Sequence, residues 1–241
     1  MAVPTVVLIH GAGDTADVWQ SVQASLGGPS VALDLVGRGQ HPADLAAVTL
    51  ESAVQQALRD IEALTAGPLV LVAHSMGGAL SPGILRSLGS RVVHLVHIAA
   101  VAAADGELPL ATASREFADN LLAAANSLRA QLRATSYADP DDHLPDGLRP
   151  LTDPLALTRV DSLNLGCVPT SWAGVAPDLP RTFIQPLHDR LYPAPAQRRL
   201  AAAIHAHRIR PLEAGHNAAR SAPEHLAHLL DDIAWARDAA I

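Results

Sequence analysis

Lysine is missing from this chain of 241 residues, since all 17 of its basic residues are arginines. The absence of lysine excludes Schiff-base chemistry and a lysine general base. Cysteine is nearly missing too: Cys167 stands alone, so no disulfide can form within the chain and an oxidising compartment is not required. The formal net charge of -7 provides no basic surface for nucleic acid, which excludes that class of partner.

Long apolar runs are also missing. No run approaches the roughly 18 residues of a membrane span, and the first residues, Met1–Pro4, contain neither the basic nor the apolar part of a secretion signal. We therefore expect a cytoplasmic protein without membrane contacts. It is expected to act on a small molecule, as a monomer or homodimer, without a metal or other cofactor. Hydrophobic residues make up 49% of the chain, which suits one domain with a sizeable core.

Short β-branched runs alternate with segments of helical periodicity along most of the chain. The runs predict buried strands over residues 3–9, 31–33, 69–73, 91–100, 181–185 and 208–211. The periodic segments predict helices over residues 16–26, 50–64, 79–88, 194–205 and 223–237. This alternation predicts an α/β fold with a mostly parallel, doubly wound sheet.

Residues 105–177 interrupt the alternation. They contain no clear buried strand, are rich in alanine and leucine over 114–133, and are broken by several prolines farther on. We predict that they form an inserted helical cap, and that residues 1–104 and 178–241 form the core. Apolar cap residues are the candidates for a substrate pocket: Phe117, Leu121, Tyr137 and Trp172. They favour a small to medium, largely apolar substrate.

The strongest functional signal lies in Leu69–Gly78, where an apolar run leads into His-Ser-Met-Gly-Gly. A helical segment follows at once, so the pattern predicts a strand, a tight turn and a helix with Ser75 at the apex. A serine in such a turn has a strained backbone, and its hydroxyl stands clear of the sheet. The usual pattern is G-x-S-x-G, and Ala73 replaces its first glycine. We interpret Ser75 as a nucleophile.

A serine nucleophile needs a base and a group that orients the base. His216 lies between the last predicted strand and the last helix, which places it at the carboxyl edge of the sheet together with Ser75. Asp189 follows the penultimate strand and fits the chain order of serine, acid and histidine, although it also suits a helix cap. Asp105, which follows the strand after Ser75, is the rival acid.

Acyl transfer also needs N–H groups that stabilise an oxyanion. The backbone of Met76, next to the serine, and that of Ala12, in the loop after the first strand, are the candidates. Three polar neighbours are expected to have structural roles. His10 would brace the loop of Ala12, His74 would shape the turn at the serine, and Asp34 would fasten the loop that follows the second strand.

The chain resembles the α/β-hydrolase family over essentially its whole length. The resemblance rests on five segments: His10–Gly13, Asp34–Gly39, Ala73–Gly78, Asp189 and Gly215–His216. It implies a triad of Ser75, Asp189 and His216, with Ala12 and Met76 as oxyanion donors. The early first strand and the short cap are similar to the branch that contains plant methylesterases and hydroxynitrile lyases.

Two positions distinguish the chain from the lyases of that branch. Those enzymes use a threonine near the end of the first strand and a lysine after the catalytic histidine, where this chain has Gly11 and Asn217. This difference disfavours cyanohydrin cleavage. We predict a serine esterase that cleaves a carboxylic ester, thioester or lactone through an acyl-enzyme. Two alternatives stay open: carbon–carbon cleavage or cyclisation with the same triad, and a non-catalytic ligand receptor on the same fold.

Overall fold

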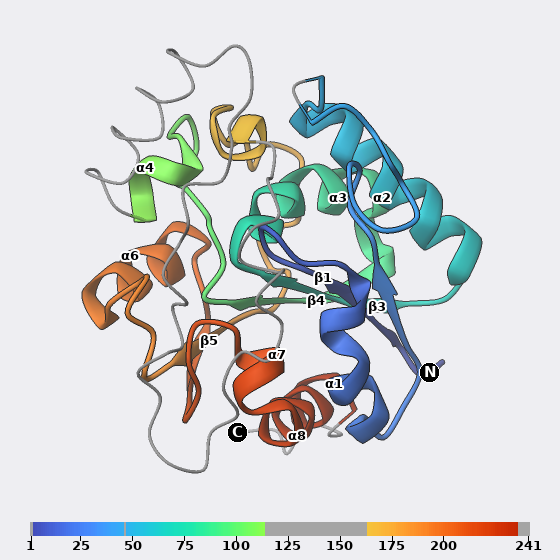
Figure 1. Cartoon of the computed structure of the whole chain (residues 1–241), viewed down its shortest axis with the longest axis vertical. Helices are drawn as coiled ribbons and strands as arrows, with labels where there is room; N and C mark the ends of the chain where they lie inside the picture. The colour runs from blue at the N-terminus through green and yellow to red at the C-terminus, as the bar shows by residue number, and fades with distance from the viewer. Residues whose placement is uncertain (1, 46, 114–162, 236–241) are drawn as a thin grey trace.

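A sheet of six strands carries the candidate site (Figure 1). Its strands are β1 (Thr5–Ile9), β2 (Ser30–Leu33), β3 (Leu69–His74), β4 (Val92–Ile98), β5 (Arg181–Pro186) and β6 (Arg208–Leu212). They lie in the order β2-β1-β3-β4-β5-β6, and each neighbouring pair is parallel. The prediction of a doubly wound α/β fold is therefore confirmed. The computed structural model describes residues 2–45, 47–113 and 163–235.

The strand order reverses between β1 and β3, because the chain first runs outward to β2 and then returns past β1. Such a reversal leaves a crevice at the carboxyl ends of the strands, where ligands bind in open α/β sheets. Ile9, the last residue of β1, pairs with Ala73 of β3, and Ala73 pairs with His97 of β4. The loops that follow these strands therefore open at the same edge.

Helices cover both faces of the sheet, and side chains alternate between the faces along each strand. Val7 and Ile9 of β1 pack with α2 (Leu50–Leu64) and α3 (Ser81–Leu88). Val6 and Leu8 face the other way. On that side they meet four helices: η1 (Ala16–Trp19), α1 (Gln20–Ser25), α7 (Ala218–Ser221) and α8 (Pro223–Ala234). Figure 1 shows α2 and α3 on one side and α1 and α8 on the other.

Helix α2 matches its predicted bounds, because both of its ends are encoded locally. The Thr49 hydroxyl accepts a hydrogen bond from the Ser52 backbone N–H, and the Ser52 hydroxyl accepts one from the Thr49 backbone N–H. The two bonds make a capping box. One face of the helix buries five apolar residues: Ala53, Val54, Ala57, Leu58 and Ile61. Gly67 and Pro68 then prevent its continuation.

Two boundaries and one short helix differ most from the prediction, and several other ends differ by one or two residues. The helix expected over 79–88 begins earlier, as the 3-10 helix η2 (Ser75–Leu80), and α3 continues it. The strand expected over 91–100 ends at Ile98, because Ala99 adopts a φ of +42° that extended backbone does not allow. The short helix α7 was not predicted, since four residues show no helical periodicity. Helix α6 (Ala194–Ala203) lies within its expected range.

The two ends of the predicted cap lie side by side. The N–H of Gly106 donates to the carbonyl of Thr170, and the N–H of Thr170 donates to that of Glu107, each at 2.8 Å. Helix α4 (Pro109–Ala113) follows this junction in the chain, and helix η5 (Leu163–Gly166) precedes its second segment at Thr170. Phe117, Leu121 and Tyr137 lie outside the described residues, so the division into core and cap stays a prediction.

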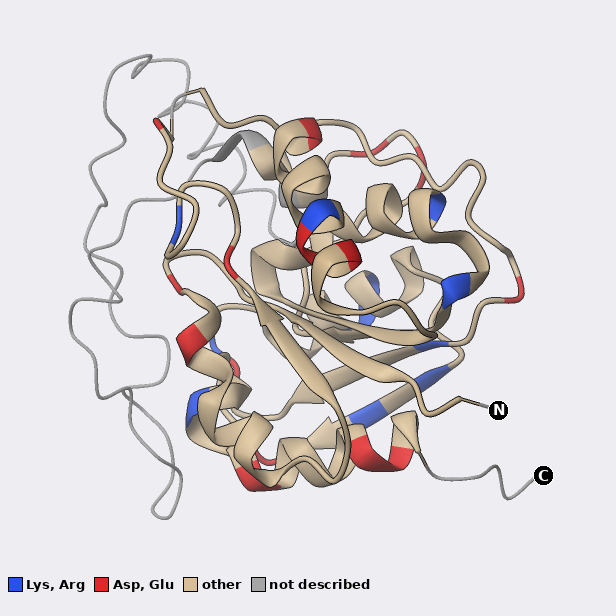
Figure 2. Cartoon of the chain, turned by 90° about the vertical axis from the view of Figure 1, so that its right-hand side faces the viewer, with Lys and Arg blue, Asp and Glu red and all other residues tan. Residues whose placement is uncertain are grey.

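Charged residues lie mainly on helices and loops, whereas most of the central sheet is uncharged (Figure 2). The exceptions are the arginine at position 181 of β5 and those at positions 208 and 210 of the outermost strand β6. Among the described segments, every helix is too short or too polar to cross a membrane.

Candidate active site

Ser75 stands at the turn where β3 ends and η2 begins. Its φ is +47°, a left-handed conformation that is strained for a residue other than glycine. Gly77 and Gly78 allow this turn to pack closely against neighbouring backbone. A Cβ added at Gly77 would lie 2.5 Å from the His10 carbonyl oxygen, and one at Gly78 would lie 2.5 Å from that of Val101. The strand, turn and helix expected from the sequence are thus present.

Three side chains from separate loops meet at this turn. The Nε2 atom of His216 lies 3.0 Å from the Oγ of Ser75, and its Nδ1 lies 2.8 Å from an oxygen of Asp189. All three residues are buried. With the Nδ1 proton donated to the carboxylate, the Nε2 lone pair accepts the serine hydroxyl proton. The arrangement is that of a nucleophile, its base and the group that orients the base.

Asp189 combines the two roles considered for it from the sequence. Its Oδ2 accepts from His216, and its Oδ1 accepts from the backbone N–H of Tyr192 at 2.8 Å. The rival acid Asp105 is exposed and accepts instead from the backbone N–H of Trp172 at 2.7 Å. Asp189 is therefore the carboxylate that contacts the imidazole, and Asp105 fastens the junction of the predicted cap.

The loop after β1 lies where the oxyanion donor was expected. His10 braces it: the ring accepts from the Leu35 N–H at 3.1 Å through Nε2 and donates to the Gly11 carbonyl at 2.8 Å through Nδ1. Ala12 is exposed, although its neighbours in the loop are buried. Met76 belongs to the first turn of η2, whose N–H groups have no carbonyl partner within the helix. That these two backbone N–H groups stabilise an oxyanion stays a prediction.

His74 links the serine turn to the histidine loop. Its Nε2–H donates to the backbone carbonyl of His216 at 2.9 Å, and its ring packs edge-on against Trp19. Burial first, and then the nearby His216, lower the pKa of His74 to about 4. The ring is therefore neutral near pH 7. Asp34 has the fastening role expected of it, since its oxygens accept from the backbone N–H groups of Ala16 and Gln40.

Sequence reasoning missed two residues beside the triad. The ring of Tyr192 meets the imidazole of His216 edge-on, with centroids 5.2 Å apart. Asp14, which follows the Ala12 loop, is buried and contacts the loop of His216 through Asn217. The position of Asp14 just beyond the His-Gly-Ala-Gly segment is the one sequence signal available for it.

Trp172 is the one predicted pocket residue that the structure describes. It is half-buried, donates from Nε1 to the Ala103 carbonyl at 2.9 Å, and lies against the guanidinium of Arg181 at 5.0 Å. These contacts place it at the base of the predicted cap. Whether it also touches substrate stays a prediction.

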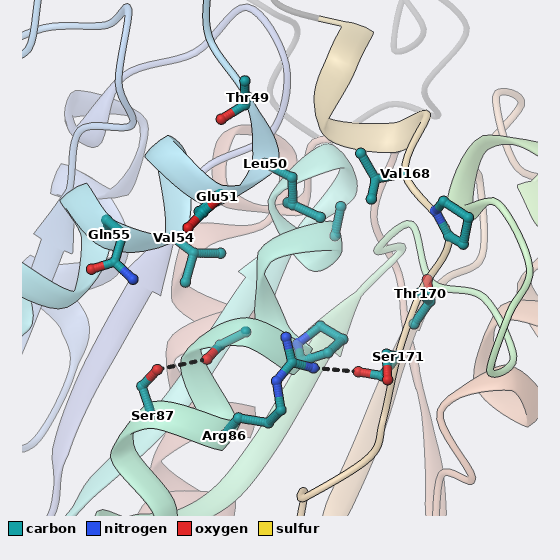
Figure 3. A pocket seen from close by; sticks show the side chains of 14 residues that line it. Thr49, Leu50, Glu51, Val54, Gln55, Arg86, Ser87, Val168, Thr170 and Ser171 are labelled. Carbon is teal, nitrogen blue, oxygen red and sulfur yellow. Dashed lines mark hydrogen bonds between the residues drawn. The ribbon is translucent and has the colours of Figure 1, made fainter.

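A groove of about 570 Å³ opens between α2, α3 and residues 168–171 (Figure 3). Arg86 donates to the carbonyl of Ser171 across it. The lining includes Val54 and Pro82 but no member of the triad. The groove is therefore separate from the reacting groups. Within the described residues, no group of three or more histidine, cysteine, aspartate or glutamate side chains is arranged to hold a metal ion.

Comparisons with known proteins agree with this fold. The sequence model of the alpha/beta hydrolase family matches residues 6–228. A curated relative, the (E)-2-((N-methylformamido)methylene)succinate hydrolase of Acinetobacter baylyi, is 38% identical over 80 residues, which cover 32% of this chain and 30% of that protein. Lipase LipV of Mycobacterium tuberculosis is 29% identical over 147 residues, covering 58% of this chain and 54% of the lipase. The matches thus span about a third and about half of these relatives.

A solved structure is similar over almost the whole chain. It is an extracellular alpha/beta-hydrolase from a Paenibacillus species, which shares structural and functional homology with tobacco salicylic acid binding protein 2. The TM-score is 0.81 at 18% identity, and the match covers 98% of this chain and 100% of the other. At this identity the likeness establishes the fold. Since the family match spans most of its length, the chain belongs to the alpha/beta hydrolase family.

Proposed function

We propose that this protein is a serine hydrolase that cleaves a carboxylic ester, thioester or lactone through an acyl-enzyme. The observation that carries the proposal is the continuous contact from Ser75 Oγ through the His216 ring to Asp189, at 3.0 and 2.8 Å. The names of the relatives, a hydrolase and a lipase, support the same class of reaction. The substrate class is inferred to be small to medium and largely apolar, from the composition of the predicted cap.

The reaction follows from this geometry in two halves. Ser75 Oγ attacks the ester carbonyl carbon while His216 Nε2 takes the hydroxyl proton, and the backbone N–H groups of Ala12 and Met76 stabilise the oxyanion. His216 then gives the proton to the leaving oxygen, and the alcohol departs. Water repeats the sequence on the acyl-enzyme: it loses a proton to His216, its oxygen attacks the carbonyl, and the proton returns to Ser75. One water is consumed, and one acid and one alcohol are formed.

A fluorophosphonate probe tests the nucleophile directly. We expect one equivalent to label the folded wild type and none to label Ser75→Ala. The chain offers a matched control in Ser81, a second buried serine, whose Oγ lies 2.9 Å from Nε2 of His97. The other ring nitrogen of His97 has no hydrogen-bond partner among the described residues. The Ser81→Ala variant should therefore keep the label. Absence of labelling in folded wild type would favour the ligand-receptor alternative.

Turnover on a substrate panel tests the reaction class. We expect p-nitrophenyl esters of several acyl lengths to be cleaved, with Ser75→Ala slower by roughly 10⁴-fold or more. Methyl esters, thioesters and lactones in the same panel identify the preferred carbonyl. Labelling of Ser75 without turnover on any member of the panel would instead favour carbon–carbon cleavage or cyclisation.

A further inference from the structure

Asp14 is a buried carboxylate that the steps above do not use. Its Oδ2 accepts from the side-chain amide of Asn217 at 2.9 Å, and its Oδ1 accepts from the guanidinium of Arg220 at 2.7 Å. The side chain of Asp14 is 7% exposed, whereas that of Arg220 is 19% exposed. The two contacts cross 203 and 206 residues of the chain, so tertiary structure alone brings these groups together.

The two ends of this link belong to the two loops that the reaction needs. Asp14 lies two residues beyond Ala12 and in the same loop, where its N–H meets the Gly11 carbonyl in a turn. Asn217 directly follows His216 and is the residue that precedes helix α7. One carboxylate therefore joins the loop that offers an oxyanion donor to the loop that carries the base.

We propose that Asp14 is a positioning residue, which holds the Ala12 loop and the His216 loop in a fixed position relative to each other during acyl transfer. The inference rests on the proposed hydrolase function. The oxyanion forms where the N–H donors point, and the proton moves along the line from Ser75 to His216, so both loops must be correct at once. A displacement of about 1 Å can lower a rate by about 10²-fold even when no reacting group is changed.

The Asp14→Asn variant weakens the link. A single neutral amide oxygen replaces two carboxylate oxygens, so it can accept from Arg220 or from Asn217 in their present orientations but not from both, and the charge assistance of both hydrogen bonds is lost. We expect kcat on a p-nitrophenyl ester to fall roughly 10-fold to 100-fold, with KM changed less than about 3-fold. The rate of fluorophosphonate labelling should fall in parallel. The control is Asp17→Asn, an exposed aspartate three residues farther on, which should match wild type.

Two further variants separate positioning from a general loss of fold. Asn217→Ala removes the same link and leaves Asp14 paired with Arg220, so it should lower kcat by a similar factor. The double variant Asp14→Asn/Asn217→Asp exchanges donor and acceptor, and should recover most of the lost kcat at its own optimal pH. Thermal unfolding midpoints identify any variant that fails to fold, and the remaining variants then decide the question.

The outcomes for the two proposals differ. If wild type is neither labelled nor active, the proposed hydrolase function fails. If wild type is active and folded Asp14→Asn or Asn217→Ala keeps wild-type kcat, the hydrolase function stands and the positioning role is overturned. A folded exchange variant no more active than Asp14→Asn also overturns it, because the hydrogen bond would then not be the cause.

Discussion

The two oxygens of Asp189 accept hydrogen bonds from different groups, and this arrangement determines which nitrogen of the His216 ring carries the proton. Oδ2 faces His216, whereas Oδ1 accepts from the backbone of Tyr192, whose ring in turn packs against the imidazole. The carboxylate is held on one side so that its other oxygen points at the ring. Because it accepts from Nδ1, the neutral imidazole carries its proton there and leaves Nε2 free to accept from Ser75.

We expect Asp189→Asn to lower kcat by about 10⁴-fold, because the amide can donate to Nδ1 and so favours the tautomer that cannot accept from serine. The measurement is kcat on a p-nitrophenyl ester, alongside an unfolding midpoint to confirm the fold. Asp105→Asn is the control: its carboxylate contacts Trp172 rather than the ring, so its kcat should stay near wild type. A greater loss in Asp105→Asn than in Asp189→Asn would contradict the assignment.

The residues of the triad could be predicted because each follows a strand, and parallel strands bring their carboxyl ends to one edge. The rule could not choose between Asp189 and Asp105, since both satisfy it, and the contact with His216 decides. Asp14 could not be predicted. Its partner Asn217 is 203 residues away, and the path of the loop after a strand depends on packing rather than on local pattern.

At the scale of elements, the turn from β3 into η2 is packed closely against neighbouring backbone. Ser75 is held at a φ of +47° while the backbone of His10 passes beside Gly77. Strain at one residue persists only where surrounding contacts determine it. The absence of side chains at positions 77 and 78 allows those contacts to be made by backbone.

We expect Gly77→Ala to lower the free energy of unfolding by at least about 1–3 kcal/mol, because the new Cβ would lie 2.5 Å from a backbone oxygen that cannot rotate away. Activity in the folded fraction should fall as well, since the turn carries Ser75. Gly67→Ala is the matched control. A Cβ there has nothing within 4 Å, so the change should be neutral or stabilise by up to about 1 kcal/mol. Denaturant titration of both variants measures the difference, and equal stability would refute this account of the turn.

Elements with local signals were predicted best. Helix α2 has a capping box and a following Gly-Pro, and its bounds match the expectation over 50–64. The helix after this turn was predicted to begin at residue 79, whereas η2 begins at Ser75, whose φ of +47° is set by the tight turn rather than by helical propensity. Strand β4 ended early for a similar reason, at Ala99. Local propensity therefore predicts which elements form, whereas long-range packing sets where some of them begin and end.

At the scale of the whole molecule, the fold buries histidines that remain neutral. Burial, followed by the charge of Arg181, lowers the pKa of His97 from 6.5 to about 3, and burial lowers the pKa of His74 to about 4. In the unfolded chain both rings take up a proton near pH 6.5. Below that pH the unfolded state binds more protons than the folded state, so the free energy of unfolding decreases with falling pH. The stability that these two neutral histidines contribute is fully present above pH 6.5 and decreases progressively as the pH falls towards 3.

His97 tests this linkage away from the reacting groups, since it lies on β4 and bonds to Ser81 on α3. The His97→Gln variant keeps a polar partner for Ser81 but cannot take up the proton. Between pH 6.5 and about 4 we expect its free energy of unfolding to decrease less steeply than that of wild type, by at most about 1.4 kcal/mol per pH unit. Urea titrations across this range measure both slopes. His225→Gln, at one of the two exposed histidines of α8, is the control and should leave the slope unchanged. Parallel pH profiles for wild type and His97→Gln would show that the His97 imidazole does not contribute to acid sensitivity.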